Sequence, residues 1–370
     1  MVLHSILPRE WIPSFSQLIQ LYFILIITIA ICAATLPILR ESILSYGKLD
    51  DVAQPPKDTT PTLSPSKTRH TPGLIIAVKN LRVPKRWFSH FYVFATLWMV
   101  YLSLDLYLVT SGAGSDIYPY LSLLSLLQWL GIIGADPSYQ GTNLLLVLAP
   151  SVQWSMVAYL LHTMRRWYET WYVERPSPTA QINIGHYIVG ITFYAAVAPA
   201  IWIDTVERTL SWNQSSPSTT LSQEWTNLGK AQFASGLALF LWASWHQHRC
   251  HRILANLRAP SSSSSSPSSS NPKSRQVDNG YKVPFGDWFQ YFVTPHYSAE
   301  MLLYLGLYIM VTSSSSGMTP TTCPTLLLAW VWVVVNLGIV SRETDAWYSN
   351  RFGPEYGGKH RRRILIPFVY

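Results

Sequence analysis

The sequence predicts an all-α protein, a multi-pass membrane bundle of about seven transmembrane helices with a lumenal N-terminus and a cytosolic C-terminus. Of its 370 residues only 12% are charged and 49% are hydrophobic, whereas about a quarter of the residues in a soluble domain are charged. The mean hydropathy is positive, at +0.16. This composition excludes a disordered chain, and three cysteines are too few for a disulfide framework.

Seven apolar runs approach the roughly 20 residues that a helix needs to cross a bilayer. They cover residues 17–39, 88–110, 141–162, 183–203, 231–248, 297–316 and 323–340. An eighth run, 120–133, is about six residues too short, and we interpret it as re-entrant or interfacial. The first run is longer than the core of a signal peptide, and no small-residue cleavage site follows it. We therefore expect it to remain as an anchor.

The basic residues predict the orientation of this bundle. With seven spans, 24 of the 27 Lys and Arg residues fall on one face, in segments 40–87, 163–182, 249–296 and 341–370. An excess of basic residues marks the cytosolic side. The net charge of +8 therefore indicates membrane orientation and not a nucleic-acid partner. The glycosylation sequon at Asn213 lies in the loop 204–230, which this orientation places in the lumen.

We expect one membrane domain over residues 1–370, with two disordered cytosolic segments. Residues 52–72 are rich in Pro, Thr and Lys, and residues 259–275 contain a serine run that cannot bury enough apolar area to become ordered. The serine-rich segment is an insertion in the C-terminal half, 246–370.

Polar side chains gather at the predicted cytosolic ends of the spans. They form five clusters, in residues 83–92, 162–169, 246–258, 286–300 and 342–368. Arginine presents a planar fork to phosphate, so a set of Arg, His and Asn residues on one face suits a phosphorylated cofactor. The chain has no P-loop and no GxGxxG motif after a strand. A nucleotide would therefore have to bind among helix ends and loops.

Two plainer interpretations compete with a cofactor site. Basic residues beside Trp or Tyr at span ends are commonly interfacial anchors, and this description fits Lys85, Arg86, Arg165 and Arg166. The basic run 361–363 fits a lipid-surface patch equally well.

Metal binding is not expected, but one acidic residue needs an explanation. The possible ligands of the third cluster point around most of a helix circumference; they are His246, His248, Cys250 and His251. Glu300 lies four residues after His296 at the start of a span, on the same helical face. A carboxylate in this position requires a polar partner.

Together the five clusters resemble the steroid 5α-reductase family, and within it the polyprenol reductase branch. The family signature is in the tail, in Trp347-Tyr348, Phe352, Tyr356, residues 361–363 and the run Ile364 to Phe368. The branch-level similarity lies in Tyr46-Gly-Lys48, Val83 to Tyr92, Arg165 to Glu169, His251, Asn256-Leu-Arg258, Gly286 to Phe289, and Pro295 to Glu300. These motifs are well separated and occur in the family's order.

The resemblance implies a seven-helix enzyme of the endoplasmic reticulum membrane that binds NADPH at its cytosolic side and reduces an activated carbon–carbon double bond. The implied cofactor contacts are Gln247, His251, Asn256, Arg258, Lys282, His296, Glu300, Tyr348 and Arg362. Arg342 is a substitute for a family histidine whose place is taken here by Thr344. The implied partners are the bilayer and a long-chain polyprenoid substrate, with no nucleic acid and no obligate protein partner.

The substrate grip of the steroid enzymes is not preserved. The family's Gln-Glu pair falls on His90 and Phe91, and its Tyr falls on His162, so Phe91 and His162 are predicted to contact a different substrate. A hydride adds to the β-carbon of a conjugated aldehyde but not to an isolated alkene. We therefore expect reduction of polyprenal to dolichal, the net conversion of polyprenol to dolichol. His90 is the first candidate donor to the enolate oxygen and His162 the second.

Three other activities compete with this prediction. A steroid or enoyl-CoA reductase belongs to the same family, and membrane methyltransferases of isoprenoid or lipid substrates also bind a cofactor at helix ends. A transporter is disfavoured because the ionisable residues lie at one face and hardly any lie in the middle of a span.

Overall fold

The computed structural model describes residues 13–36, 81–111, 122–123, 126–127, 148–177, 180–208, 226–258, 282–313, 322–353, 356 and 362–364. The predicted disordered segments 52–72 and 259–275 lie outside the described residues. The same holds for Asn213 and for most of the apolar run 120–133.

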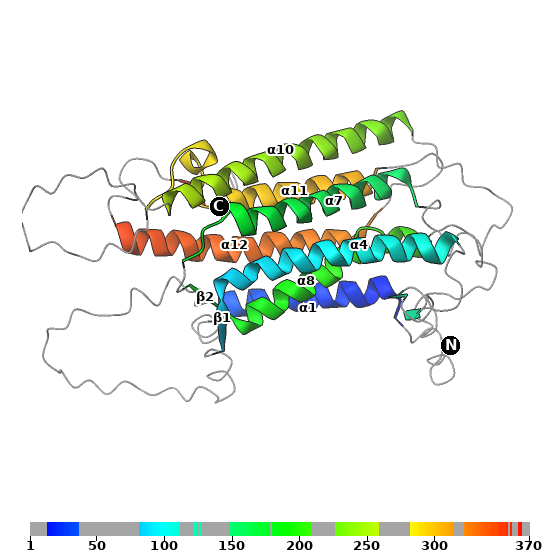
Figure 1. Cartoon of the computed structure of the whole chain (residues 1–370), viewed down its shortest axis with the longest axis horizontal. Coiled ribbons are helices and arrows are strands. Elements are labelled where there is room, and N and C mark those ends of the chain that lie inside the picture. Colours follow the sequence, from blue (N-terminus) through cyan, green and yellow to red (C-terminus); the bar gives the residue numbers. More distant parts are fainter. Residues whose placement is uncertain are drawn as a thin grey trace, which may run out of the picture.

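Within the described residues, seven long helices lie lengthwise in one bundle (Figure 1). They are α1 (Phe15–Thr35), α4 (Ser89–Ser111), α7 (Pro150–Tyr168), α8 (Ile184–Ala200), α10 (Asn227–Leu257), α11 (Pro295–Val311) and α12 (Pro324–Phe352). Each overlaps one of the seven apolar runs. In the described part of the chain, four stretches are long and apolar enough to cross a membrane, namely 15–35, 85–108, 184–208 and 324–352. The architecture is thus that of an all-α membrane protein.

Local sequence signals explain where these helices begin. Ser14 and Gln17 form a capping box at the start of α1, in which each side chain bonds to the other residue's backbone. Three helices carry a proline in their first turn, where its missing N–H costs nothing: Pro150, Pro295 and Pro324. Helices α10 and α12 continue beyond the apolar runs that end at 248 and 340, so the polar residues that follow are helical too.

A small sheet, which the sequence analysis did not predict, ties the start of α4 to the start of α8. Strand β1 (Arg82–Pro84) pairs with β2 (Gln181–Asn183) in antiparallel fashion, with Val83 opposite Ile182. The short helix η3 (Lys85–Phe88) follows β1, and the amide of Lys85 donates to the carbonyl of Ala180 at 2.8 Å. Strands of three residues are too short to show a period-two pattern in a sequence.

One end of the bundle, which we call the site end, collects the sheet, the last turns of α7, α10 and α12, and the first turns of α4, α8 and α11 (Figure 1). The tail also returns there, because Val293 donates its N–H to the carbonyl of Arg363 at 2.9 Å. The Thr294 hydroxyl donates to the Ser341 hydroxyl at 2.7 Å and so joins α12 to the turn before α11. The described parts of the four basic segments thus lie at one end.

Candidate active site

A cavity of about 740 Å³ lies at the site end, between α1, α4, α8, α10, α11 and α12. Its volume is typical of cavities that hold cofactors or small ligands. One part of its wall carries basic side chains, from Lys85, Arg86, Arg166, Arg175, Arg258 and Lys282. Another part is apolar, with Ile26, Ile29, Ala33, Val189, Phe193, Trp332 and Val333. The cavity therefore suits a ligand, or a pair of ligands, with an anionic part and a long hydrocarbon part.

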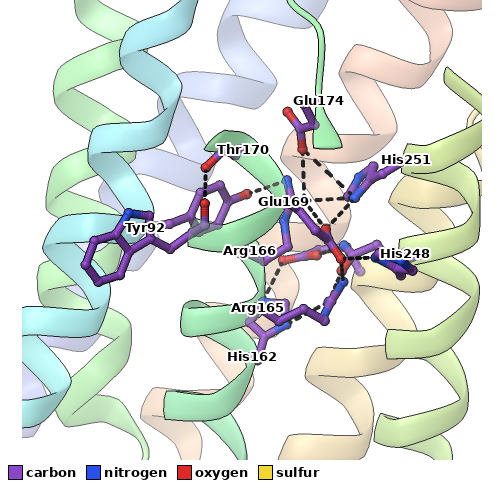
Figure 2. Close-up of polar contacts among 12 residues, drawn as sticks. Tyr92, His162, Arg165, Arg166, Glu169, Thr170, Glu174, His248 and His251 are labelled. Carbon is purple, nitrogen blue, oxygen red and sulfur yellow. Dashed lines mark hydrogen bonds and ion pairs between the residues drawn. The ribbon is translucent and has the colours of Figure 1, made fainter. Parts of the chain in front are cut away.

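Arg166, in the last turn of α7, is the centre of a buried polar network (Figure 2). Its Nη1 lies 2.5 Å from Glu169 Oε2, 2.9 Å from Glu174 Oε1 and 2.8 Å from His251 Nδ1. Its Nη2 donates to the Tyr92 hydroxyl at 3.1 Å. The guanidinium thereby connects α4, α7 and α10.

A widened turn positions the two carboxylates. Residues Glu169–Val173 form one turn of π-helix, η6, directly after α7, a feature that is frequent at functional sites. The turn brings Glu174 back to Arg166, which lies eight residues earlier. Burial raises the pKa of Glu169, but the hydrogen bond with His251 and the charge of Arg166 outweigh it, so the net pKa is lowered. The pKa of Glu174 is also lowered, because the charge of Arg166 outweighs burial. Both carboxylates are therefore ionised at neutral pH.

A second chain of polar contacts runs from this network to Glu300 on α11. Arg165 Nη1 lies 2.5 Å from Glu169 Oε1, and Arg165 Nη2 donates to the side-chain oxygen of Gln247. The amide nitrogen of Gln247 in turn donates to the Glu300 carboxylate. His162 Nε2 lies 3.7 Å from the other oxygen of Glu300. Glu300 thus has the polar partners that its place at the start of an apolar helix requires.

The histidines of α10 contact carboxylates of the protein. His248 Nδ1 lies 2.8 Å from Glu169 Oε1, and His246 Nδ1 lies 3.1 Å from Asp287 Oδ1. Ligand atoms of Glu169, Glu174 and His251 lie within 4.8 Å of one another, a spacing that a metal ion can use. Arg166 Nη1, however, is within 2.9 Å of an atom of each of them. The positive charge at this point is therefore a guanidinium.

Most of the side chains that the resemblance assigned to the cofactor line the cavity. These are Gln247, His251, Arg258, Lys282, His296, Glu300 and Tyr348, together with the predicted substrate residue Phe91. Asn256 and Arg342 are exposed and are not part of its wall. Arg362 lies behind the wall, with its guanidinium 4.2 Å from the centre of the Phe285 ring, and donates to the carbonyl of Pro284 at 3.0 Å. It therefore supports the segment that carries Lys282.

Neither candidate donor histidine forms part of the cavity wall. His90 is exposed, and its Nδ1 lies 3.1 Å from the Tyr187 hydroxyl. His162 is only 2% exposed and is enclosed by the rings of Tyr159, Phe240 and Tyr304. Its Nδ1 lies 3.2 Å from Arg165 Nη2 and its Nε2 lies 3.7 Å from Glu300 Oε1, so His162 lies behind the wall, next to Glu300 and Tyr304.

Several residues of the wall were not among the cofactor or substrate contacts predicted from the sequence. They are Lys85, Arg86, Tyr92, Arg166, Glu174 and His186. One signal was present, because Arg165 and Arg166 precede Glu169 by four and three residues, a spacing that favours ion pairs on a helix. These pairs show that both arginines bind carboxylates of the protein and are not simple lipid anchors.

Comparison with known proteins shows the family of this chain. Residues 200–370 match the family described as 3-oxo-5-alpha-steroid 4-dehydrogenase. The polyprenal reductase of Rattus norvegicus is 30% identical over 299 residues, which cover 78% of this chain and 79% of that protein. Polyprenal reductase 2 of Arabidopsis thaliana is 29% identical over 79% of this chain and 84% of its own length. For the polyprenal reductase of Homo sapiens, the identity is 28% over 81% of each chain. By these similarities, the chain belongs to the steroid 5α-reductase family.

Proposed function

We propose that this protein is a polyprenal reductase that takes hydride from NADPH. The reaction saturates the double bond next to the aldehyde of polyprenal and gives dolichal, which supplies dolichol for protein N-glycosylation. The main observation behind this proposal is that one cavity has both a basic part and an apolar part. A phosphorylated cofactor and an isoprenoid can meet in such a space, and the curated relatives named above bear the name polyprenal reductase.

The basic part of the wall fits the phosphates of NADPH. Lys85, Arg86, Arg258 and Lys282 come from three separate segments and all face the cavity. Gln247 and Glu300 offer an amide and a carboxylate to the polar groups of the same molecule. When bound, NADPH supplies the hydride. The network around Arg166 fixes α4, α7 and α10 relative to one another and so keeps this wall in place.

The apolar part of the wall fits an isoprenoid chain. Ile26, Ile29, Ala30 and Ala33 follow one another at helical spacing along a single face of α1. Ile29 lines the cavity and is nevertheless 52% exposed, so the cavity meets the outer surface beside α1. A chain too long for the cavity can pass there into the lipid while its aldehyde stays inside. In this proposal all seven helices span the endoplasmic reticulum membrane, with the N-terminus lumenal and the site end cytosolic.

Turnover by the purified protein in lipid nanodiscs tests the substrate. NADPH is supplied with polyprenal, polyprenol, a steroid enone or an enoyl-CoA, and the products are identified by mass spectrometry. We expect NADPH oxidation and dolichal formation with polyprenal only. Consumption of the steroid enone but not of polyprenal would refute the proposal. Binding of S-adenosylmethionine in place of NADPH would favour a methyltransferase.

A matched pair of arginine variants on α10 tests the cofactor site. Both arginines are exposed, but Arg258 lines the cavity and Arg252 lies outside its wall. Loss of a phosphate contact worth about 1.4 kcal/mol weakens binding about tenfold. We expect Arg258→Ala to raise the dissociation constant for NADPH by this factor and Arg252→Ala to leave it unchanged. Equal effects of the two substitutions would mean that only the overall positive charge matters.

A further inference from the structure

Reduction of a conjugated aldehyde requires a donor at its oxygen. As hydride adds to the β-carbon, the electrons of the double bond move toward the carbonyl and negative charge develops on the oxygen. A hydrogen-bond donor placed at that oxygen stabilises the transition state. The donor must face the cavity, because the aldehyde is held there under the proposed function, on which this inference rests.

Several polar side chains of the wall are poor candidates for this donor. Glu300 is a carboxylate that already accepts from Gln247. The hydroxyl of Tyr304 lies 3.2 Å from that of Tyr159, so it already shares a hydrogen bond with another hydroxyl of the protein. The arginines of the wall can donate hydrogen bonds but cannot give up a proton in a protein.

We propose that Tyr92 is the catalytic residue that binds the aldehyde oxygen and protonates it. Tyr92 lines the cavity, is 5% exposed and follows directly after Phe91, the predicted substrate contact. Its hydroxyl oxygen accepts a hydrogen bond from Arg166 Nη2 at 3.1 Å, and the guanidinium carbon lies 4.7 Å from the centre of its ring (Figure 2). Because a guanidinium only donates, the proton of the phenol is directed to a different acceptor.

Arg166 prepares this phenol for proton transfer. The guanidinium is buried and fixed by Glu169 and Glu174. A phenolate formed at Tyr92 would therefore be stabilised by a positive charge already in place, without rearrangement of the site. Tyr92 is the part of this network that meets the substrate, while Arg166 acts through it as a positioning residue.

In this step Tyr92 gives up its phenolic proton and later recovers it. Hydride from NADPH forms the new C–H bond at the β-carbon, the double bond shifts to the α-carbon and carbonyl carbon, and the oxygen takes the proton of Tyr92. The resulting enol returns that proton to the phenolate as the α-carbon takes up a proton from water. The net change is the addition of one hydride and one solvent proton across the double bond, with oxidation of NADPH to NADP⁺.

The variant Tyr92→Phe tests the assignment because it keeps the ring and removes only the hydroxyl. The control is Tyr187→Phe, whose hydroxyl contacts His90 and lies outside the cavity wall. Loss of an oxyanion donor lowers kcat by about 100- to 1,000-fold. We expect this loss, with unchanged NADPH binding, for Tyr92→Phe and near wild-type turnover of polyprenal for Tyr187→Phe.

A spectroscopic readout separates a chemical role from a structural one. Farnesal, a short isoprenoid enal isotopically labelled at its carbonyl carbon, is bound together with NADP⁺, so that no turnover occurs. A hydrogen bond from Tyr92 lowers the carbonyl stretching frequency of the bound aldehyde, and we expect Tyr92→Phe to abolish this shift. If the variant lost activity but kept the shift, or kept wild-type activity, the assignment would be overturned. Wild-type enzyme that left polyprenal unreduced would instead overturn the proposed function itself.

Discussion

The two ends of the bundle use acidic residues in different ways. At the site end, Glu169 and Glu174 surround Arg166 beside a cavity. At the opposite end, which we call the far end, Asp204 and Glu207 lie in the short helical stretch 203–208 that follows α8, and they accept hydrogen bonds from the first turns of other helices. Asp204 accepts from the Thr325 N–H at 3.0 Å, and Glu207 from the Ser16 N–H at 3.0 Å. Helix N-termini favour anions. The far-end carboxylates therefore join α12 and α1 to the stretch that follows α8, whereas the site-end carboxylates hold a cation.

Among substitutions at either end, removal of Arg166 should lower the free energy of unfolding the most. Arg166→Met leaves Glu169 and Glu174 without their shared guanidinium, and an uncompensated buried charge costs about 3–5 kcal/mol. We expect a fall of this size in the free energy of unfolding, measured by denaturant titration in detergent, together with loss of NADPH binding. Arg252→Met, at an exposed position of α10, is the control. A change below about 1 kcal/mol would mean that the network contributes little to folding.

The same network makes the site end sensitive to acid. The pKa values of Glu169 and Glu174 are lowered in the folded state from their ordinary value of 4.5. Their contribution to stability is therefore complete above pH 4.5 and is lost as the pH falls below it toward their folded pKa values. The slope is about 1.4 kcal/mol per pH unit for each proton taken up on unfolding. We expect the melting temperature to drop below pH 4.5 and Glu169→Gln to flatten this dependence. If the melting temperature of the variant depended on pH as steeply as that of the wild type, groups other than Glu169 would cause the acid sensitivity.

Substitution at the far end should affect folding without affecting the site. Asp204 accepts from both the N–H and the hydroxyl of Thr325, at 3.0 and 2.7 Å, and loss of such a cap costs about 2 kcal/mol or less. We expect Asp204→Ala to lower the melting temperature while the KM for NADPH stays at its wild-type value. Asp204→Asn keeps one acceptor oxygen and should lower the melting temperature less than Asp204→Ala does. A raised KM in either variant would show that the two ends are coupled.

Hydropathy predicted the course of the chain well. The seven long helices of the described residues all overlap apolar runs, because a long apolar run favours a helix, which satisfies its own backbone hydrogen bonds. The pairing of β1 with β2 and the π-helical turn after α7 were not predicted. The sheet joins distant segments and the π-helix is a single local turn, so neither leaves a periodic signal in a short stretch.

The direction of side chains was harder to predict than their position in the chain. His90 and Tyr92 are two residues apart on α4 and are therefore separated by a rotation of about 200° around the helix axis, which places them on nearly opposite sides. Tyr92 faces the cavity and His90 faces outward. Helix α4 is apolar on all sides, and its sequence does not reveal which side meets the cavity. The polar cluster 83–92 could thus be located, but its members could not be ranked.

The smallest effect should come from packing at the site end, at Gly190 of α8. A Cβ atom at this position would lie 2.5 Å from Cζ of Phe91. The rings of Phe88 and Tyr187, with centroids 4.7 and 5.3 Å from that of Phe91, restrict its movement. The methyl group of an alanine at position 190 would therefore push the Phe91 ring toward the cavity. Gly190→Ala should narrow the passage for the substrate.

We expect Gly190→Ala to raise the KM for polyprenal about tenfold, equivalent to about 1.4 kcal/mol, with unchanged NADPH binding. The control is Gly338→Ala in α12, where an added Cβ meets nothing within 4 Å. It carries the same gain in helix propensity. Phe91→Leu combined with Gly190→Ala should restore part of the loss, because the smaller side chain leaves the passage open. If Gly190→Ala weakened NADPH binding instead, Phe91 would belong to the part of the wall that binds the cofactor. The basic side chains and the packed aromatic rings of the site end would then both contact NADPH.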